Sequence, residues 1–379
     1  MADGMVFSVA ANDRGSAARA GVLRLPHGEV STPAFMPVGT AGTVKALSAE
    51  DLREIGFEII LANTYHLYLR PGMDVMAGAG GLHRFMAWDG NILTDSGGYQ
   101  VFSLSKLRKI ERGGVLFRSH VDGSGHLFTP ESVVEAQCVI GSDIQMQLDV
   151  CSAWGAGRGE AERALELTTD WMGRAMRAWE RARGEGYAGS LFAIVQGNFF
   201  HDLRRRSAEA CAESGAPGIA IGGLSVGEPS GAFEEALAFT APLLPAEKPR
   251  YLMGIGTPEY ILKAIENGID MFDCVVPTRE GRNGRVYTRR GPLALKKTDR
   301  RMDFAPIDKE CSCRVCRQHS RAYLRHLFKN GEILCAMLAS YHNLHFLRRL
   351  VLDARAAIGE NRFLEFKRDF LASYGEEAE

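Results

Sequence analysis

The sequence has no long hydrophobic run and no excess of charge of either sign. None of its apolar stretches approaches the ~18 residues that a bilayer-spanning segment needs. The opening MADGMVF has no basic segment followed by an apolar one, as a secretion signal would. Lysine and arginine number 45 against 46 aspartates and glutamates, for a net charge of −1. We therefore expect a cytoplasmic protein without a membrane segment, in which any contact with nucleic acid comes from a local basic patch.

The chain also lacks the common signatures of nucleotide binding. No G-x-G-x-x-G follows its first apolar run, and it contains no G-K-[ST], so no nucleotide cofactor is expected. Hydrophobic residues make up 46% and charged residues 24% of its 379 residues, as in an ordinary globular protein. This length fits two or three domains, or one large barrel with an insertion.

Eight short apolar runs alternate with segments of helical period between Pro33 and Pro277. Their hydrophobicity is continuous rather than alternating, which is typical of strands buried on both faces of a parallel sheet. The runs occupy residues 33–38, 58–63, 91–94, 143–148, 191–195, 218–221, 250–253 and 271–276.

Helix start and stop signals stand between these runs. Residues 48–51 (SAED) have the pattern of a capping box, and Thr129 and Thr257 each precede a proline suited to the first helical position. We expect helices to stop at Gly56, Gly141, Gly215 and Gly268. Eight strand and helix units over about 250 residues predict an α/β protein with a (β/α)8 TIM barrel, rather than an open doubly wound sheet.

The alternation breaks after Pro277. Residues 279–310 combine turn-forming glycines with many basic residues, a cysteine cluster follows, and helices are expected at 314–329 and 344–374. We predict three parts: a barrel core over residues 1–278, a basic, zinc-binding subdomain over 279–343, and a C-terminal helical segment over 344–379 that packs on the barrel.

Polar residues and glycines follow the apolar runs, at the end of the barrel where active sites lie. Asp273 is the strongest signal, because it interrupts an apolar run where burying a charge is costly unless the charge is paired or used. Each candidate has a structural alternative: Asp273 can pair with an arginine, Asp95 can close a turn, and Asp149 and Gln196 can cap the sheet. Because these residues are expected to converge on one mouth of the barrel, a catalytic role is favoured over the structural alternatives.

Two carboxylates across a barrel mouth suit displacement at an anomeric carbon. One forms a glycosyl ester as the nucleophile and the other moves protons on the leaving group. The remaining aspartate, with Gln196 and the backbone N–H groups of residues 222–224, can read the edge of a purine-like base. Tyr99 and Met253 can stack on that base, although packing in the barrel is the alternative for both.

Three of the eight cysteines, Cys311, Cys313 and Cys316, are bunched. In a reducing compartment such a cluster indicates a metal, and three thiolates readily form part of a tetrahedral zinc site. Spacing leaves the fourth ligand open among His319, His326, His342 and His345. No open coordination position is evident, so we expect structural zinc; three free cysteines are the alternative.

Basic residues are dense from Arg279 to Arg301 and recur from Arg314 to Lys329 at near-helical spacing. A run of charge is usually a solvated face. Because this one begins just past Asp273 and continues into the cysteine cluster, we predict a surface that holds nucleic-acid phosphates.

Taken in order, these motifs resemble those of the bacterial tRNA-guanine transglycosylases, also called queuine tRNA-ribosyltransferases. The resemblance covers nearly the whole chain. It rests on residues 32–40 (TPAFMPVGT), 94–100 (TDSGGYQ), 195–197 (VQG), 222–224 (GGL), 251–254 (YLMG), 271–274 (MFDC), 277–279 (PTR), 281–284 (GRNG), the cysteine cluster and 320–323 (SRAY).

The resemblance implies a (β/α)8 barrel with a zinc subdomain, usually a homodimer. Its implied activity is a glycosyltransferase reaction that exchanges guanine at the anticodon wobble position of tRNA for a 7-deazaguanine in queuosine biosynthesis. The implied substrates are tRNAs with GUN anticodons, which are those for aspartate, asparagine, histidine and tyrosine.

The resemblance also implies residue roles. Asp273 matches the nucleophile on ribose C1′, and Asp95 matches the general acid/base. The positions matching base contacts are Ser96, Gly97, Gly98, Tyr99, Asp149, Cys151, Gln196, Gly222, Gly223, Leu224 and Met253. Those matching RNA contacts are Gly254, Ile255, Gly256, Thr257, Pro258, Glu259, Tyr260, Thr278, Arg279, Glu280, Gly281 and Arg282. The matching zinc ligands are Cys311, Cys313, Cys316 and His342.

The choice of incoming base turns on two valines. Val150 stands where bacterial members commonly have a glutamate, whereas the adjacent Cys151 is kept. Val226 fits the bacterial pattern, and eukaryotic relatives tend to have glycine there. Branched bulk at Val226 favours preQ1, with its small aminomethyl group, over queuine. Direct use of queuine, through a pocket reshaped at Val150, is the alternative.

Two other function classes fit part of the sequence. A retaining glycosidase shares the barrel and the carboxylates, but Trp171 and Trp179 fall on one expected helix rather than at strand ends, where sugar platforms would be. A zinc-dependent RNA-binding module without chemistry leaves the acidic mouth unexplained.

Overall fold

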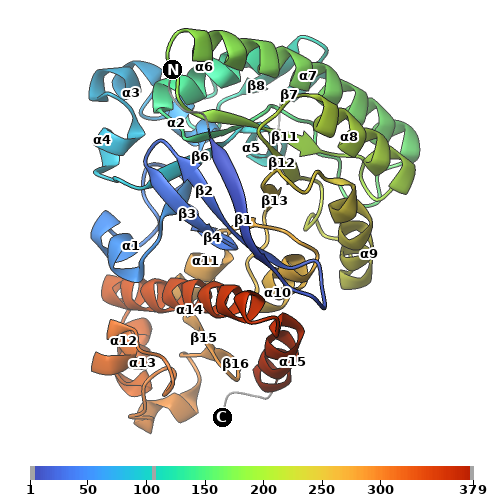
Figure 1. Cartoon of the computed structure of the whole chain (residues 1–379). Coiled ribbons are helices and arrows are strands. Elements are labelled where there is room, and N and C mark those ends of the chain that lie inside the picture. Colours follow the sequence, from blue (N-terminus) through green and yellow to red (C-terminus); the bar gives the residue numbers. More distant parts are fainter. Residues whose placement is uncertain (1–4, 105–107, 376–379) are drawn as a thin grey trace.

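The computed structural model describes residues 5–104 and 108–375, and its centre is a barrel of eight parallel strands (Figure 1). Around the barrel the strands follow the order β4, β14, β13, β12, β11, β10, β6, β5, and a bridge between Val38 and Leu61 joins the two ends. Each predicted apolar run forms one of these strands, so the barrel is confirmed. The strands are β4 (Ala34–Pro37), β5 (Ile59–Asn63), β6 (Asn91–Asp95), β10 (Ile144–Met146), β11 (Ser190–Val195), β12 (Gly218–Ile221), β13 (Arg250–Leu252) and β14 (Met271–Cys274).

Apolar side chains fill the barrel, and helices cover its outside. Met36, Leu61, Ile144, Phe192 and Met271 belong to one cluster of buried residues inside it. The helices between the strands are α1 (Ala49–Ile55), α2 (Thr64–Leu69), α3 (Met73–Ala79), α4 (Leu82–Met86), α5 (Gly98–Leu104), α6 (Pro130–Ile140), α7 (Arg158–Gly184), α8 (His201–Glu213), α9 (Ser230–Thr240), η1 (Ala241–Leu243), α10 (Pro258–Glu266) and α11 (Val276–Arg282).

The helix signals are confirmed at most positions. Ser48 and Asp51 form the predicted capping box, with Asp51 N 3.1 Å from Ser48 Oγ, and Gly56 ends α1 in the left-handed conformation (φ 90°). Thr129 likewise caps α6. Thr257 also occupies the predicted N-cap position, before Pro258 at the start of α10, but its side chain makes no hydrogen bond to the helix.

An antiparallel sheet that the sequence patterns did not predict covers the amino ends of the barrel strands. It consists of β1 (Val6–Asn12), β2 (Arg19–Leu25) and β3 (Gly28–Thr32). Phe7 and Leu25 pack against the interior cluster, and His27 contacts Asp143 and Asn91 at the starts of β10 and β6. One end of the barrel is therefore closed by this sheet.

A second small sheet follows β6 on the carboxyl side of the barrel. It consists of β7 (Arg108–Glu111), β8 (Gly114–Arg118) and β9 (Gly125–Phe128), paired antiparallel. Phe117 and Phe128 pack with Tyr65 and Trp171 in a separate apolar cluster. This sheet too was not predicted.

The C-terminal part packs below the barrel on one long helix, α14 (Ile333–Gly359) (Figure 1). Its other elements are β15 (Arg285–Thr288), β16 (Gly291–Ala294), η2 (Thr298–Met302), α12 (Arg314–Gln318), α13 (Arg321–Lys329) and α15 (Phe363–Tyr374). The helix expected over 314–329 is wrong as one element, because the chain is extended at His319 and Ser320. α14 runs without a break across residue 343, where the boundary between the zinc-binding subdomain and the C-terminal segment was predicted. The three-part division remains a prediction.

Within the described ranges, no helix is both long and apolar enough to cross a membrane.

Candidate active site and metal centre

The polar residues predicted at the strand ends lie at the open, carboxyl end of the barrel. Asp95 is the last residue of β6 and Asp273 lies in β14, while Asp149 and Gln196 follow β10 and β11. The charge of Asp273 reaches Asp95 and raises its pKa, and Gln196 bonds directly to Asp149. The structure therefore brings the three carboxylates and the amide to one mouth.

Asp273 is held through one carboxylate oxygen. The Tyr251 hydroxyl donates to Oδ1 at 2.6 Å, and the Gly254 backbone N–H donates to the same oxygen at 2.8 Å. Burial raises the pKa of Asp273, and these two hydrogen bonds oppose that rise. Within residues 5–104 and 108–375, no donor is hydrogen-bonded to Oδ2, so the second oxygen is available to an electrophile. A fixed carboxylate with one free oxygen is the arrangement that a nucleophile needs.

In Asp95, unlike Asp273, both carboxylate oxygens accept hydrogen bonds. Its Oδ1 accepts from the Thr64 and Gly97 backbone N–H groups at 3.0 and 3.2 Å. Its Oδ2 accepts from Asn63 Nδ2 at 2.5 Å and from Gln100 Nε2 at 2.7 Å. Burial is the largest influence on Asp95 and raises its pKa to about 6, with the nearby charge of Asp273 adding to the rise. A carboxyl group that titrates near neutrality can both give and take a proton, as general acid/base chemistry requires.

Asp149, Gln196 and two glycines form a recognition edge. Gln196 Nε2 donates to Asp149 Oδ2 at 2.7 Å, and Ser96 Oγ lies 3.5 Å from Oδ1. A Cβ at Gly222 would lie 2.7 Å from Gln196 Nε2, and one at Gly223, whose φ is +67°, would lie 2.6 Å from Gln196 Oε1. Only glycine fits there, because any side chain would displace the amide. The edge presents a carboxylate, an amide and backbone groups, which complement the mixed donors and acceptors of a purine.

The remaining predicted base contacts lie around this edge. Burial, with the charge of Asp149, raises the pKa of the Cys151 thiol to about 12, so Cys151 is a neutral group. Met253 packs against the barrel interior, while Tyr99, on the first turn of α5, is 55% exposed. Stacking of a base between Tyr99 and Met253 remains a prediction.

Sequence reasoning missed four residues of the mouth. Asn63 and Gln100 hold Asp95, and Tyr251 holds Asp273. Glu228 accepts from the backbone N–H groups of Ser225 and Val226 at 2.5 and 2.8 Å and fixes the loop after β12. Asn63 had a signal, since it is the polar residue that ends its apolar run. Tyr251 had none, because an aromatic inside an apolar run does not show which way it points.

The partly buried carboxyl of Asp149 should make the protein less stable at high pH, and Asp149→Asn should relieve this. Burial raises the pKa of Asp149 from 3.8 to about 6. Because the folded-state pKa is the higher, stability falls as pH rises from about 4, and the cost is fully present above about pH 6. At about 1.4 kcal/mol per pKa unit, the cost is at most about 3 kcal/mol, and less because the side chain is only partly buried. Urea unfolding at pH 4.5 and pH 8 would measure it.

The control for this prediction is an exposed aspartate whose pKa is shifted the other way. Hydrogen bonds from Ser124 and Ser119 lower the pKa of Asp122 to about 2, so Asp122→Asn should destabilise the protein at pH 8. A gain for Asp149→Asn of the same size at both pH values would show that relief of the buried charge is not its cause.

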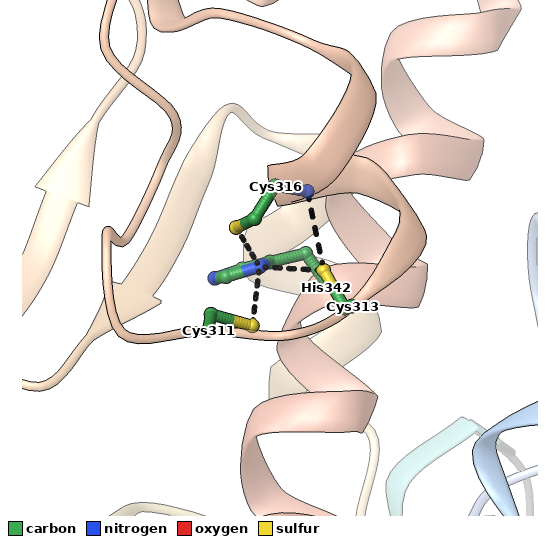
Figure 2. A group of neighbouring side chains, drawn as sticks. All are labelled: Cys311, Cys313, Cys316 and His342. Atoms are coloured by element: carbon green, nitrogen blue, oxygen red, sulfur yellow. Dashed lines mark hydrogen bonds between the residues drawn. The ribbon is translucent and has the colours of Figure 1, made fainter.

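A second site gathers three cysteines and one histidine (Figure 2). His342 Nδ1 lies 3.9 Å from the Sγ of Cys311, 3.5 Å from that of Cys313 and 3.3 Å from that of Cys316. In a tetrahedral zinc site with ordinary bond lengths, sulfur and nitrogen ligands lie about 3.6 Å apart. The four donors therefore have the spacing of a metal site, and the group can hold a metal ion.

The orientation of the His342 ring selects its ligand atom. Nε2 lies 2.6 Å from the carbonyl oxygen of Tyr287, which accepts a hydrogen bond from the protonated Nε2 and leaves the Nδ1 lone pair facing the thiolates. Among the other histidines, His345 Nδ1 lies 3.7 Å from Cys311 Sγ, whereas His319 stacks on Tyr323 and His326 contacts Asn330. Of the four histidines left open by spacing, His342 alone joins all three cysteines.

The predicted basic surface is only partly correct. Arg279 is exposed on the last turn of α11, but Arg300 is 8% exposed and pairs with Asp303 at 3.1 Å. Arg314 pairs with Asp51 and Glu54 of α1 and lies over the Tyr341 ring. Arg300 and Arg314 are therefore paired with carboxylates of the fold, and a phosphate-binding surface remains a prediction.

The predicted RNA-contact segments flank Asp273. Residues 254–260 comprise the loop after β13 and the first turn of α10, and residues 278–282 lie on α11, which follows β14. Gly254 is exposed beside the Asp273 carboxylate, while Ile255 is 1% exposed and belongs to the core. Some residues of these segments are therefore exposed at the mouth, whereas others are buried in the core.

Known proteins match almost the entire length of this chain. A family model described as Queuine tRNA-ribosyltransferase matches residues 13–376. A Queuine tRNA-ribosyltransferase of Treponema denticola is 56% identical over 369 residues, covering 97% of both chains. Proteins of the same name from Borrelia hermsii and Caldanaerobacter subterraneus are 54% and 53% identical, covering 98% and 97% of this chain and 99% and 97% of theirs.

Proposed function

The chain belongs to the queuine tRNA-ribosyltransferase family, and we propose that it exchanges guanine in tRNA through a covalent ribosyl ester on Asp273. It is a tRNA-guanine transglycosylase of queuosine synthesis, that is, a pentosyltransferase. The observation that carries the proposal is the pairing of a fixed Asp273, with Oδ2 free, and an Asp95 that titrates near pH 6.

The exchange consists of two displacements at ribose C1′. In the first, Asp273 Oδ2 forms a bond to C1′ while the C1′–N9 bond breaks, and the departing guanine takes that electron pair and a proton from Asp95. In the second, N9 of the incoming base gives its proton to Asp95 and bonds to C1′, and the ester oxygen returns to Asp273 as a carboxylate. Two inversions retain the configuration of the sugar.

The recognition edge fits the base that leaves and the one that enters. Asp149 can accept hydrogen bonds from the N–H groups on the pyrimidine side of guanine. Gln196 is hydrogen-bonded to Asp149, and this bond orients its amide toward the neighbouring atoms of the base. The Gly223 peptide lies against Gln196 and can donate to the base carbonyl. A 7-deazaguanine keeps all of these groups, so the same edge serves both bases.

We propose that the tRNA anticodon lies over residues 254–260 and 278–282. The first segment follows β13 and the second follows β14, the strand that contains Asp273, and Arg279 is exposed there to meet a phosphate. Ile255, which is buried, would support the loop rather than contact RNA. The substrates we propose are the tRNAs with GUN anticodons, which carry guanosine at the wobble position followed by uridine.

The metal we propose is zinc, with a structural role. Cys311, Cys313, Cys316 and His342 supply four protein donors of the kind that structural zinc sites use, which leaves no open position for a substrate. Bound zinc would join the segment carrying the cysteines to α14.

We also propose a homodimer. Large apolar side chains are exposed on the C-terminal part, where Met302 is 70%, Phe304 71% and Ile333 77% exposed. Exposed apolar side chains of this size are common at protein interfaces.

The incoming base we propose is preQ1, and Val226→Gly should raise the use of queuine. Val226 is partly buried in the loop that Glu228 fixes, and filling a pocket with excess bulk typically costs about 1–3 kcal/mol, or about 5- to 150-fold. Val150 packs on the apolar cluster of Tyr65 and Trp171, so its side chain is occupied there. Competition between the two bases on one tRNA would measure the preference.

The matched control for Val226→Gly is Ser225→Gly, which loosens the same loop without removing the valine. Ser225 is exposed and has a φ of 59°, so glycine is easily accommodated there. Equal effects of the two variants would show that loop freedom, and not bulk, sets the choice. A wild-type preference for queuine would refute the preQ1 assignment while leaving the exchange reaction intact.

A further inference from the structure

A second cluster of metal-binding side chains lies at the closed end of the barrel, away from both sites described above. His27 stands in the turn between β2 and β3, His83 in α4, and Asp143 immediately before β10. His27 Nδ1 lies 2.7 Å from Asp143 Oδ1, and His83 Nε2 lies 3.2 Å from Asp143 Oδ2. The two imidazole rings are stacked, with centroids 3.7 Å apart and planes at 17°. Three elements distant in sequence thus bring three donor side chains together, with their ligand atoms within 4.8 Å of one another.

The hydrogen bonding of the cluster is incomplete. His83 Nε2 is buried and, despite its distance from Oδ2, is not aligned with any hydrogen-bond partner in the described residues. Asp143 is 1% exposed, and its Oδ2 also accepts from the Ile92 backbone N–H at 2.7 Å. Within residues 5–104 and 108–375, no lysine or arginine forms an ion pair with Asp143. A buried nitrogen without a partner beside a buried carboxylate is unusual and indicates that a ligand atom is required.

We propose that His27, His83 and Asp143 bind one divalent transition-metal ion of the zinc class. Two imidazole nitrogens and one carboxylate oxygen suit Zn²⁺, Co²⁺ or Ni²⁺ rather than Mg²⁺ or Ca²⁺, which prefer oxygen ligands. With metal–ligand bonds of about 2.1 Å, neighbouring donors lie about 3.0–3.4 Å apart. The observed separations of 2.7 and 3.2 Å are close to this range, and the stacked rings must turn relative to one another so that both nitrogen lone pairs point at one ion.

Access and proton balance are consistent with this site. The His27 side chain is 40% exposed, whereas that of His83 is 13% exposed, so an ion can enter past His27 and water can complete its coordination. Binding replaces the His27–Asp143 hydrogen bond with two bonds to the metal, and any proton held between them is released. The bound ion would fasten the β1–β3 sheet and α4 to the start of β10, which makes its role structural.

Zinc binding by the full-length chain tests the proposal. With zinc in excess over protein at pH 7.5, the wild type should hold two ions per chain by elemental analysis after removal of free metal. His27→Gln and His83→Gln should each hold one. Cys316→Ser should keep the ion at the closed end and lose the other. His201→Gln, which removes a partly exposed histidine that stacks on Phe239 of α9, is the matched control and should keep both ions.

A thermal measurement makes the test independent of the variants' folding. Added zinc should raise the unfolding midpoint of the Cys316→Ser chain, because an ion that binds only the folded state stabilises it, and this rise should vanish in the Cys316→Ser, His27→Gln double variant. A wild type that holds a single ion per chain would overturn the proposal. So would a second ion that persists in both histidine variants.

Discussion

Replacing Asp273 with asparagine should abolish base exchange while leaving tRNA bound. The amide is nearly isosteric and can keep the hydrogen bonds from Tyr251 and Gly254 through its carbonyl oxygen, so the site should keep its shape. It cannot form the ester, however, and loss of a nucleophile typically costs about 10⁴-fold or more in turnover. Exchange of labelled guanine into tRNA would measure turnover, and filter binding would measure affinity, which we expect to change less than about threefold.

The covalent step gives this prediction a second readout. Wild-type enzyme, incubated with tRNA and a base that binds but turns over poorly, should form an adduct that survives denaturation. Asp273→Asn should form none. Asp95→Asn should also lose turnover, because the departing base then receives no proton. If the adduct persists in Asp273→Asn and disappears in Asp95→Asn, the two roles are reversed.

Tyr251→Phe separates positioning from chemistry at the same carboxylate. It removes the 2.6 Å hydrogen bond to Oδ1 and leaves the nucleophilic oxygen untouched. We expect the adduct still to form, more slowly by about 10- to 100-fold, since one hydrogen bond to a charged group is worth about 1.5–3 kcal/mol. The rate of adduct formation in single-turnover experiments would measure this effect.

The barrel and its mouth could be predicted because burial on both faces leaves a plain signal. Each strand is a continuous apolar run, so the position where the run ends is also the position of the mouth, and Asp95, Asp149 and Gln196 followed from that alone. The two antiparallel sheets left no such signal. In β1 the side chains are mostly exposed, and its burial pattern has no regular period that the sequence could show.

Pairing partners distant in sequence account for most of what was missed. Arg314 belongs to a run of positive charge, but Asp51 and Glu54 of α1, far away in the sequence, neutralise it inside the fold. Local sequence shows the run and does not show the partners. Spacing likewise could not choose the fourth metal ligand, because His342 lies on α14 while the cysteines lie at and before α12; the family resemblance indicated His342, and the structure places it among the thiolates.

Removing His342 should release the metal from the cysteine site and loosen the segment that carries it. Loss of an outer partner of a metal ligand typically costs about 10- to 100-fold in affinity, so loss of the ligand itself should cost at least about 100-fold. In cobalt-loaded protein, absorption from sulfur-to-cobalt charge transfer reports the thiolate site alone, so ions bound elsewhere do not contribute. His342→Ala and Cys313→Ser should each lose this absorption at cobalt concentrations that saturate the wild type.

The matched control is His345→Ala, one turn further along the same helix. His345 Nδ1 lies 3.7 Å from Cys311 Sγ, near enough to replace a ligand, but it approaches only one of the three thiolates. Its removal should leave the cobalt absorption and the thermal midpoint nearly unchanged, as should His319→Ala. Because the Tyr287 carbonyl fixes the ring of His342, a metal bound through His345 instead would leave His342 as a hydrogen-bonding residue only. Loss of the absorption in His345→Ala, with its retention in His342→Ala, would establish that exchange of ligands.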